Sequence, residues 1–221
     1  MAATMRARSR AAIVAIAPAV LLAASVYHPY IADPTDPAAV AAALASDTTR
    51  WTLSHLTVGV GSGLAVLAFL AIRSYLREAG EEHWSILALP FIIMGSTLFA
   101  FLPAMEIAVL AAAEAGADVQ AVQTALGSWF FPILLIAAIT FALGVLGFAM
   151  GIVRSRVLGS RLTWLVVGAF VIMAAARFFP FGAALYVGGV AAIVALWPLA
   201  YEMWKHLEAQ PVGQPRPKPS T

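Results

Sequence analysis

The sequence contains no cysteine, and only 11% of its 221 residues are charged. Without cysteine the chain has no disulfides, no thiolate metal ligands and no thiol nucleophile. An ordinary soluble domain carries about 25% charged residues, so most of this chain has no water to face. Hydrophobic residues make up 62% of it. We therefore predict an all-α, polytopic membrane protein.

Motifs that would identify an activity are also missing. The sequence has no HExxH, no GxSxG elbow, no phosphate-binding loop and no DDxxD-type acidic pair. Its net charge is only +2, and no basic stripe interleaved with aromatic residues occurs. We therefore expect no nucleic-acid partner. The sequence names no reaction, and a non-enzymatic role is favoured over an enzyme.

Hydrophobic segments long enough to cross a bilayer, about 20 residues each, organise the chain into one domain over residues 1–206. Between the first two segments we expect a proline- and aspartate-rich loop with one or two helical turns at the surface. The stretch FFPFG predicts a tight hairpin between the last two. The proline-rich residues 207–221 predict a disordered cytoplasmic tail. The six expected spans are about 11–30, 51–73, 85–112, 129–153, 162–179 and 181–204.

Basic residues indicate the orientation, because cytoplasmic loops carry an excess of lysine and arginine. With the N-terminus inside, 11 of the 13 basic residues are cytoplasmic, and only Arg50 and Arg177 lie outside. The many alanines and arginines fit a high-GC bacterial genome. We predict a multi-pass protein of the bacterial cytoplasmic membrane with both termini cytoplasmic. MRARSR and the apolar run after it also resemble a signal peptide cleaved near Ala24, but a retained first helix is favoured.

Small residues at helical spacing predict where helices approach closely. Gly59 and Gly63 form a GxxxG pair in the second span. Gly144, Gly147 and Gly151 lie on one stripe of the fourth span. We expect helix packing at both places, and no nucleotide-binding loop.

Four ionisable side chains from four spans are predicted to share a level near the outer face. His28 ends the first span, His55 lies one turn into the second, and Glu106 falls in the outer half of the third. Arg177 ends the fifth span on the same side. Charged residues within membranes are expensive and usually paired or functional.

Several interpretations of this group remain open. Glu106 and Arg177 could form a structural ion pair supported by His55, or Glu106 could titrate in a proton-coupled transporter. The set His28, His55 and Glu106 could bind zinc or iron as a two-histidine, one-carboxylate site. A single haem between His28 and His55 is a further option. His83 and His206 are interpreted as interface residues.

The stretch YHPYIADP…DTTRWTLSHL resembles a broad group of six-helix integral membrane proteins of high-GC, actinobacterial-type bacteria. In that group the first helix ends in His-Pro, here His28 and Pro29, and the second opens with an aromatic residue and a histidine, here Trp51 and His55. The stretch GSWFFPILLIAAITFALGVLGFAMGIVRSR resembles its fourth helix. The resemblance implies the six-helix fold and emphasises the two histidines, but it implies no activity.

The favoured function is binding of a small molecule, ion or lipid in an outer-leaflet pocket around His55, Glu106 and Arg177, as a small transporter or accessory subunit. The alternative is a membrane-embedded metal- or haem-dependent enzyme or redox protein using His28, His55 and Glu106. A purely structural subunit of a larger complex is the third hypothesis. No cofactor is the leading expectation. Expected partners are membrane lipid, a small-molecule or ion ligand, and a homo- or hetero-oligomer.

Overall fold

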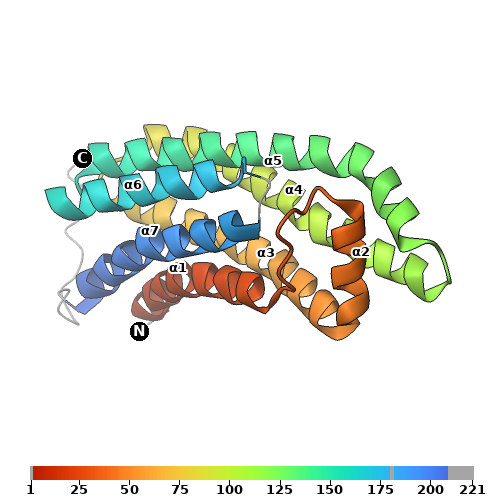
Figure 1. The fold of residues 1–221 in the computed structure, drawn as a ribbon. Helices are drawn as coiled ribbons and strands as arrows, with labels where there is room; N and C mark the ends of the chain where they lie inside the picture. The colour runs from red at the N-terminus through yellow and green to blue at the C-terminus, as the bar shows by residue number, and fades with distance from the viewer. Residues whose placement is uncertain (1, 180–181, 209–221) are drawn as a thin grey trace, which may run out of the picture.

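The computed structural model describes residues 2–179 and 182–208, and every regular element within them is an α-helix (Figure 1). Five helices are long and apolar enough to cross a membrane, namely α1, α3, α4, α5 and α7. The apolar helix α6 is shorter, with 17 residues. The all-α prediction is confirmed, and the five long apolar helices indicate a membrane protein. The helices are α1 (Ala2–Tyr27), α2 (Pro37–Ser46), α3 (Thr48–Glu78), α4 (His83–Glu114), α5 (Val119–Ser155), α6 (Ser160–Ala176) and α7 (Gly182–Glu208).

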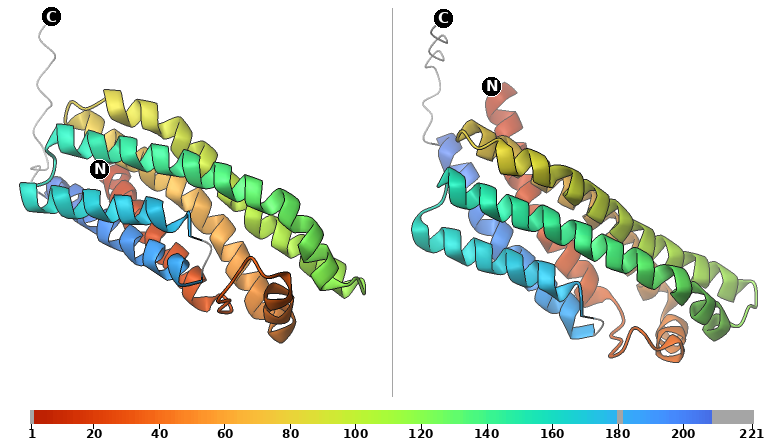
Figure 2. Two further views of the ribbon diagram at one scale, coloured as in Figure 1. Left: turned by 45° about the horizontal axis from the view of Figure 1, so that its top comes forward. Right: turned by 90° about the horizontal axis from the view of Figure 1, so that it is seen from above.

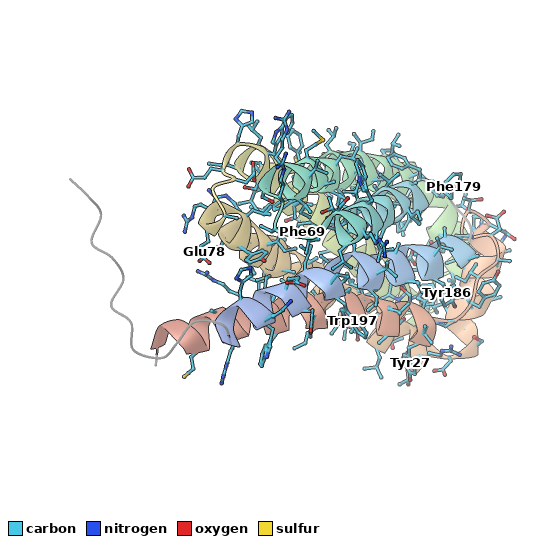
Figure 3. All side chains as sticks on the ribbon, turned by 90° about the vertical axis from the view of Figure 1, so that its left-hand side faces the viewer. Tyr27, Phe69, Glu78, Phe179, Tyr186 and Trp197 are labelled. Atoms are coloured by element: carbon cyan, nitrogen blue, oxygen red, sulfur yellow. The ribbon has the colours of Figure 1, made fainter. Side chains whose placement is uncertain are left out.

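The helices other than α2 form a closed ring in the order α1, α3, α4, α5, α6, α7, each packing on its two neighbours. The start of α1, the end of α7 and the α3–α4 and α5–α6 connections lie at one end of the bundle (Figure 2). At the other end α2 packs against α5 and α3. In Figure 3 Phe69 lies among the helices, whereas Tyr27 and Trp197 project from the bundle. The core around Phe69 includes Phe141, Phe148 and Phe170.

Aspartate side chains fix where three helices begin at the α2 end. Asp36 accepts a hydrogen bond from the Ala38 N–H, and Asp47 accepts one from the Arg50 N–H. Asp118 caps α5 in the same way, as expected for an N-cap aspartate. The helix therefore begins at Val119 rather than near residue 129, and its 37 residues extend over about 55 Å.

The unequal helix lengths leave an overhang at this end. The 17 residues of α6 cover only about 26 Å, so the α4–α5 hairpin continues well beyond the end of α6 (Figures 1 and 2). The segment predicted as a loop with one or two helical turns at the surface contains the 10-residue helix α2, which folds back here. Val40 and Leu44 of α2 are buried against Trp51 and Val109.

The glycine stripe of α5 lies directly against α4. A Cβ at Gly144 would lie 2.8 Å from the backbone nitrogen of Ile92, and one at Gly147 would lie 2.6 Å from the Ala88 Cβ. A Cβ at Gly151 would lie 2.9 Å from a carboxylate oxygen of Glu81 in the α3–α4 connection. Gly144 and Gly147 therefore hold α5 and α4 at a separation that a side chain would increase.

The packing contact predicted at Gly59 and Gly63 is not present in the structure. A Cβ at either position would have no neighbouring atom within 4 Å. The glycine of α3 that approaches another helix is Gly61, where a Cβ would lie 2.6 Å from Leu21 of α1. The reason is the rotation of α3, which buries Gly61 and leaves Gly63 exposed.

The two predictions for the last part of the chain fall partly outside the described residues. Residues 180 and 181 of the predicted FFPFG hairpin lie outside the described part of the chain. Gly182, which follows them, donates a backbone hydrogen bond to the carbonyl oxygen of Ala32. Of the predicted tail, residues 207 and 208 belong to α7, and residues 209–221 lie outside the described part.

Candidate functional site

A cavity of about 520 Å³ lies inside the helix ring, and His28, His55, Glu106 and Arg177 all line it. Its volume is within the range of about 300–1,000 Å³ found for small-molecule sites. Every ring helix contributes to its wall, and Val40 of α2 also lines it. The arrangement brings the four ionisable residues to one cavity from four separate segments of the chain.

Arg177 occupies the C-terminal end of α6 and inserts between two aromatic rings. Its guanidinium carbon lies 4.0 Å from the centre of the Phe99 ring and 3.9 Å from that of Phe141. Such contacts stabilise a cation but accept none of its N–H groups in the way an anion does. Phe99 comes from α4 and Phe141 from α5, so the three helices meet at this side chain.

The predicted ion pair between Glu106 and Arg177 is not formed. Among the side chains that the structure describes, the single pair of opposite charges within 4 Å joins Arg10 to Glu78 at 3.0 Å. Glu106 instead accepts a hydrogen bond of 2.6 Å from the side-chain amide of Gln123. Both partners are buried. Glu106 therefore has an amide as its hydrogen-bond partner, and the Arg177 guanidinium lies between two aromatic rings.

Gln123 is the site residue that the sequence analysis missed. The sequence analysis places residues 119–128 in the connection before a span predicted to begin near 129, whereas they form the first turns of α5. The sequence does contain a signal for an earlier helix start, because Val119, Val122 and Leu126 follow the capping aspartate at helical spacing. In the structure these three residues pack against the buried cluster around Trp51. On that helix Gln123 faces inward.

The rings of His28 and His55 lie side by side at an angle of 59°, with their centres 4.9 Å apart. The centre of the Trp51 ring lies 4.4 Å from that of His55. The Nδ1 atom of His28 lies 2.6 Å from the Pro29 carbonyl oxygen, and that of His55 lies 2.7 Å from the Trp51 carbonyl oxygen. Because a carbonyl oxygen only accepts, both Nδ1 atoms carry hydrogen. In the neutral ring this leaves the Nε2 lone pair of each histidine unprotonated.

The neutral form is favoured at His28. Burial lowers the pKa of this histidine, and the hydrogen bond to the Pro29 carbonyl opposes the shift only in part. The nearby charge of Arg50 lowers the pKa further. Arg50 also donates to the carbonyl oxygens of Tyr27 and His28 at the end of α1, which fixes the backbone that carries the ring.

The predicted metal-ligand set of His28, His55 and Glu106 is not assembled. Within the described ranges, no three or more histidine, aspartate or glutamate side chains are grouped closely enough to hold a metal ion. The two histidines are adjacent, but the Glu106 carboxyl is engaged by Gln123. A metal or haem at this site would therefore be held by the imidazole pair.

The chain matches no protein-family model, no curated protein and no solved structure. What the site can do therefore follows from its own chemistry: one cation between two aromatic rings, one amide-bound carboxyl and two paired imidazoles in a largely apolar cavity.

Proposed function

We propose that this chain is an integral protein of the bacterial cytoplasmic membrane that binds a small molecule, ion or lipid in the outer half of a six-span bundle. The observation that carries the proposal is the cavity of about 520 Å³ lined by His28, His55, Glu106 and Arg177. Polar groups that converge in a mostly apolar cavity are typical of ligand sites. Ionisable residues inside a membrane domain are seldom kept without a role. A small transporter or an accessory subunit would use such a site.

The proposed topology has α6 as the sixth span and both termini in the cytoplasm. Its support is the distribution of basic side chains. Arg73 and Arg77 near the end of α3, Arg154 and Arg161 around the α5–α6 connection, and Lys205 of α7 belong to the bundle end where α1 begins. An excess of this kind marks the cytoplasmic side. Because α1 supplies part of the cavity wall, we propose that it is retained rather than cleaved.

Native mass spectrometry of the purified chain tests the binding proposal. We expect a small molecule or lipid to remain bound at one copy per chain. Ala192 lines the deep part of the cavity, so Ala192→Phe should displace it, whereas Leu165→Phe, at an exposed position on α6, should not. A bare wild-type chain, or a ligand that survives Ala192→Phe, would contradict a site in this cavity.

The absence of native cysteine makes the topology directly testable. Ala117→Cys places one thiol in the exposed α4–α5 connection, and Glu82→Cys places one in the exposed α3–α4 connection. In intact cells a membrane-impermeant maleimide should label the first variant, and should label the second only after lysis. The reverse pattern would overturn the proposed orientation.

A second candidate function, a metal or haem protein, is favoured by the pairing of His28 and His55. Metal-ligating histidines usually donate their other ring N–H to a carbonyl or carboxylate, as both Nδ1 atoms do here. Elemental analysis and an absorption spectrum of the purified chain test this candidate. A stoichiometric metal or haem that is lost in His55→Ala would support it, and a metal content unchanged by that substitution would exclude the pair.

A further inference from the structure

The Arg177 guanidinium has no anionic partner among the described residues. It makes no ion pair there, and its contacts are with the rings of Phe99 and Phe141. A guanidinium presents five N–H donors in a planar fork that matches a carboxylate or a phosphate. Ring faces stabilise the charge but leave that fork unused. The cavity therefore contains a receptor for an anionic group.

The lining of the cavity changes character along its length. At the α2 end it includes His28, Glu106 and Gln123. Arg177 lies further in, against Phe141, whose ring centre is 6.2 Å from that of Phe69. The rest of the inner lining is mostly apolar. On α1 the lining runs from His28 inward to Ala17, a distance of about 16 Å at 1.5 Å per helical residue. A ligand that fills this space needs a polar head and a long apolar part. The inner lining includes Ala17, Ala65, Phe69, Met173, Ala192 and Leu196.

The exposed lining residues show where the cavity opens. Phe131 of α5, Phe179 after α6 and Leu185 of α7 line the cavity and also have 40%, 52% and 55% of their surface exposed. They lie where α6 ends and α5 continues beyond it, so this part of the opening faces sideways from the bundle. Near α2, Thr35 and Thr124 are also exposed lining residues. The apolar rim of Phe131, Phe179 and Leu185 favours entry from the lipid phase over entry from water.

We infer that the ligand is a single-chain amphipathic monoanion, with its anionic head on Arg177 and its acyl chain along the apolar lining of the cavity, which includes Phe69 and Leu196. This inference rests on the proposed function, because it names the ligand class of the same cavity. Arg177 supplies one positive charge, and Glu106 adds a carboxyl to the same lining. A head with two negative charges is therefore disfavoured, and a carboxylate or a phosphodiester fits.

Binding of three matched probes to the purified wild-type chain tests the inference. Hexadecanoic acid carries a carboxylate, a lysophosphatidylglycerol carries a phosphodiester, and hexadecanol has the same chain with no charge. We expect at least one of the two anions to bind about tenfold or more tightly than hexadecanol, since the charged hydrogen bonds to Arg177 are available only to an anion. The anion that binds more tightly shows whether the site prefers a carboxylate or a phosphodiester head group. Equal binding of all three probes would overturn the inference.

Substitution at Arg177 assigns the preference to this side chain. Arg177→Gln should remove the preference for the anions, while Arg161→Gln, an exposed arginine at the start of α6, should preserve it. If Arg177→Gln does not fold, Arg177→Lys keeps the charge without the planar fork and should reduce the preference in part. An anion preference that is unchanged in either Arg177 variant would contradict the inference.

The outcomes separate this inference from the proposed function. If none of the three probes binds but a different molecule co-purifies and is displaced by Ala192→Phe, the cavity is a site for another ligand class and the inference alone fails. If no probe binds and no molecule co-purifies, both fail.

Discussion

The pairing of Glu106 with Gln123 predicts an unusual tolerance to neutralising a buried acid. In Glu106→Gln the new side-chain oxygen can still accept from the Gln123 amide, which lies 2.6 Å from the carboxylate oxygen. The loss is the charge contribution to one hydrogen bond, about 1 kcal/mol of unfolding free energy. Gln123→Leu instead leaves the carboxyl without a donor and should cost about 1–3 kcal/mol.

An ion pair between Glu106 and Arg177 predicts the opposite order. Removing one partner of a buried pair costs about 3–5 kcal/mol, because the other charge remains unpaired. Denaturant unfolding in detergent, followed by tryptophan fluorescence, measures these differences. A double-mutant cycle should show coupling of about 0.5–3 kcal/mol between Glu106 and Gln123, and almost none between Glu106 and Arg177. A large loss in Glu106→Gln that Arg177→Gln restores would refute this reasoning.

Three further changes test other parts of the fold. Gly144→Ala should be less stable than Gly63→Ala by about 1–3 kcal/mol. A Cβ at residue 144 would lie 2.8 Å from the α4 backbone, whereas a Cβ at residue 63 would have no neighbouring atom within 4 Å. Equal melting temperatures of the two variants in detergent would contradict this packing. Glu81 accepts two N–H groups of the first turn of α4, so Glu81→Ala should lose about 1 kcal/mol in the same assay, whereas Glu82→Ala, which removes no capping bond, should not. The pKa of His28 in the native protein lies below its ordinary value, so the unfolded chain binds the proton first as the pH falls. The free energy of unfolding should therefore decrease as the pH drops through about 6.5 toward the native pKa. Denaturation curves of wild type and His28→Gln on either side of pH 6.5 should show that this part of the pH dependence is lost in the variant.

The membrane class and the helices could be predicted because both depend on local composition. A run of about 20 apolar residues is enough to identify a spanning helix, and five such helices are present. The boundaries were less accurate where polar residues continue a helix. Gln123 was assigned to a connection for this reason, although Asp118 caps a helix that runs through it.

That the site residues line one cavity could be anticipated, but their depths and partners could not. Counting residues along each span predicts one level for His28, His55, Glu106 and Arg177, and all four line one cavity. Arg177 nevertheless lies against Phe99, which is about 10 Å inward of Glu106 along α4. Which side chains touch depends on how each helix is rotated about its axis, and hydropathy does not encode that rotation. Arg177 therefore meets Phe141 rather than Glu106. The same limitation misassigned the close contact on α3 to the GxxxG pair.

The sideways opening between α5 and the end of α6 determines which ligand concentration sets the occupancy of the cavity. Amphiphiles partition strongly into bilayers, so the concentration that reaches the Phe131 and Leu185 rim is a mole fraction in the leaflet. Occupancy would then depend on the ratio of amphiphile to lipid and would change little when the surrounding water is diluted. A site with such an opening would therefore respond to the composition of the membrane around it.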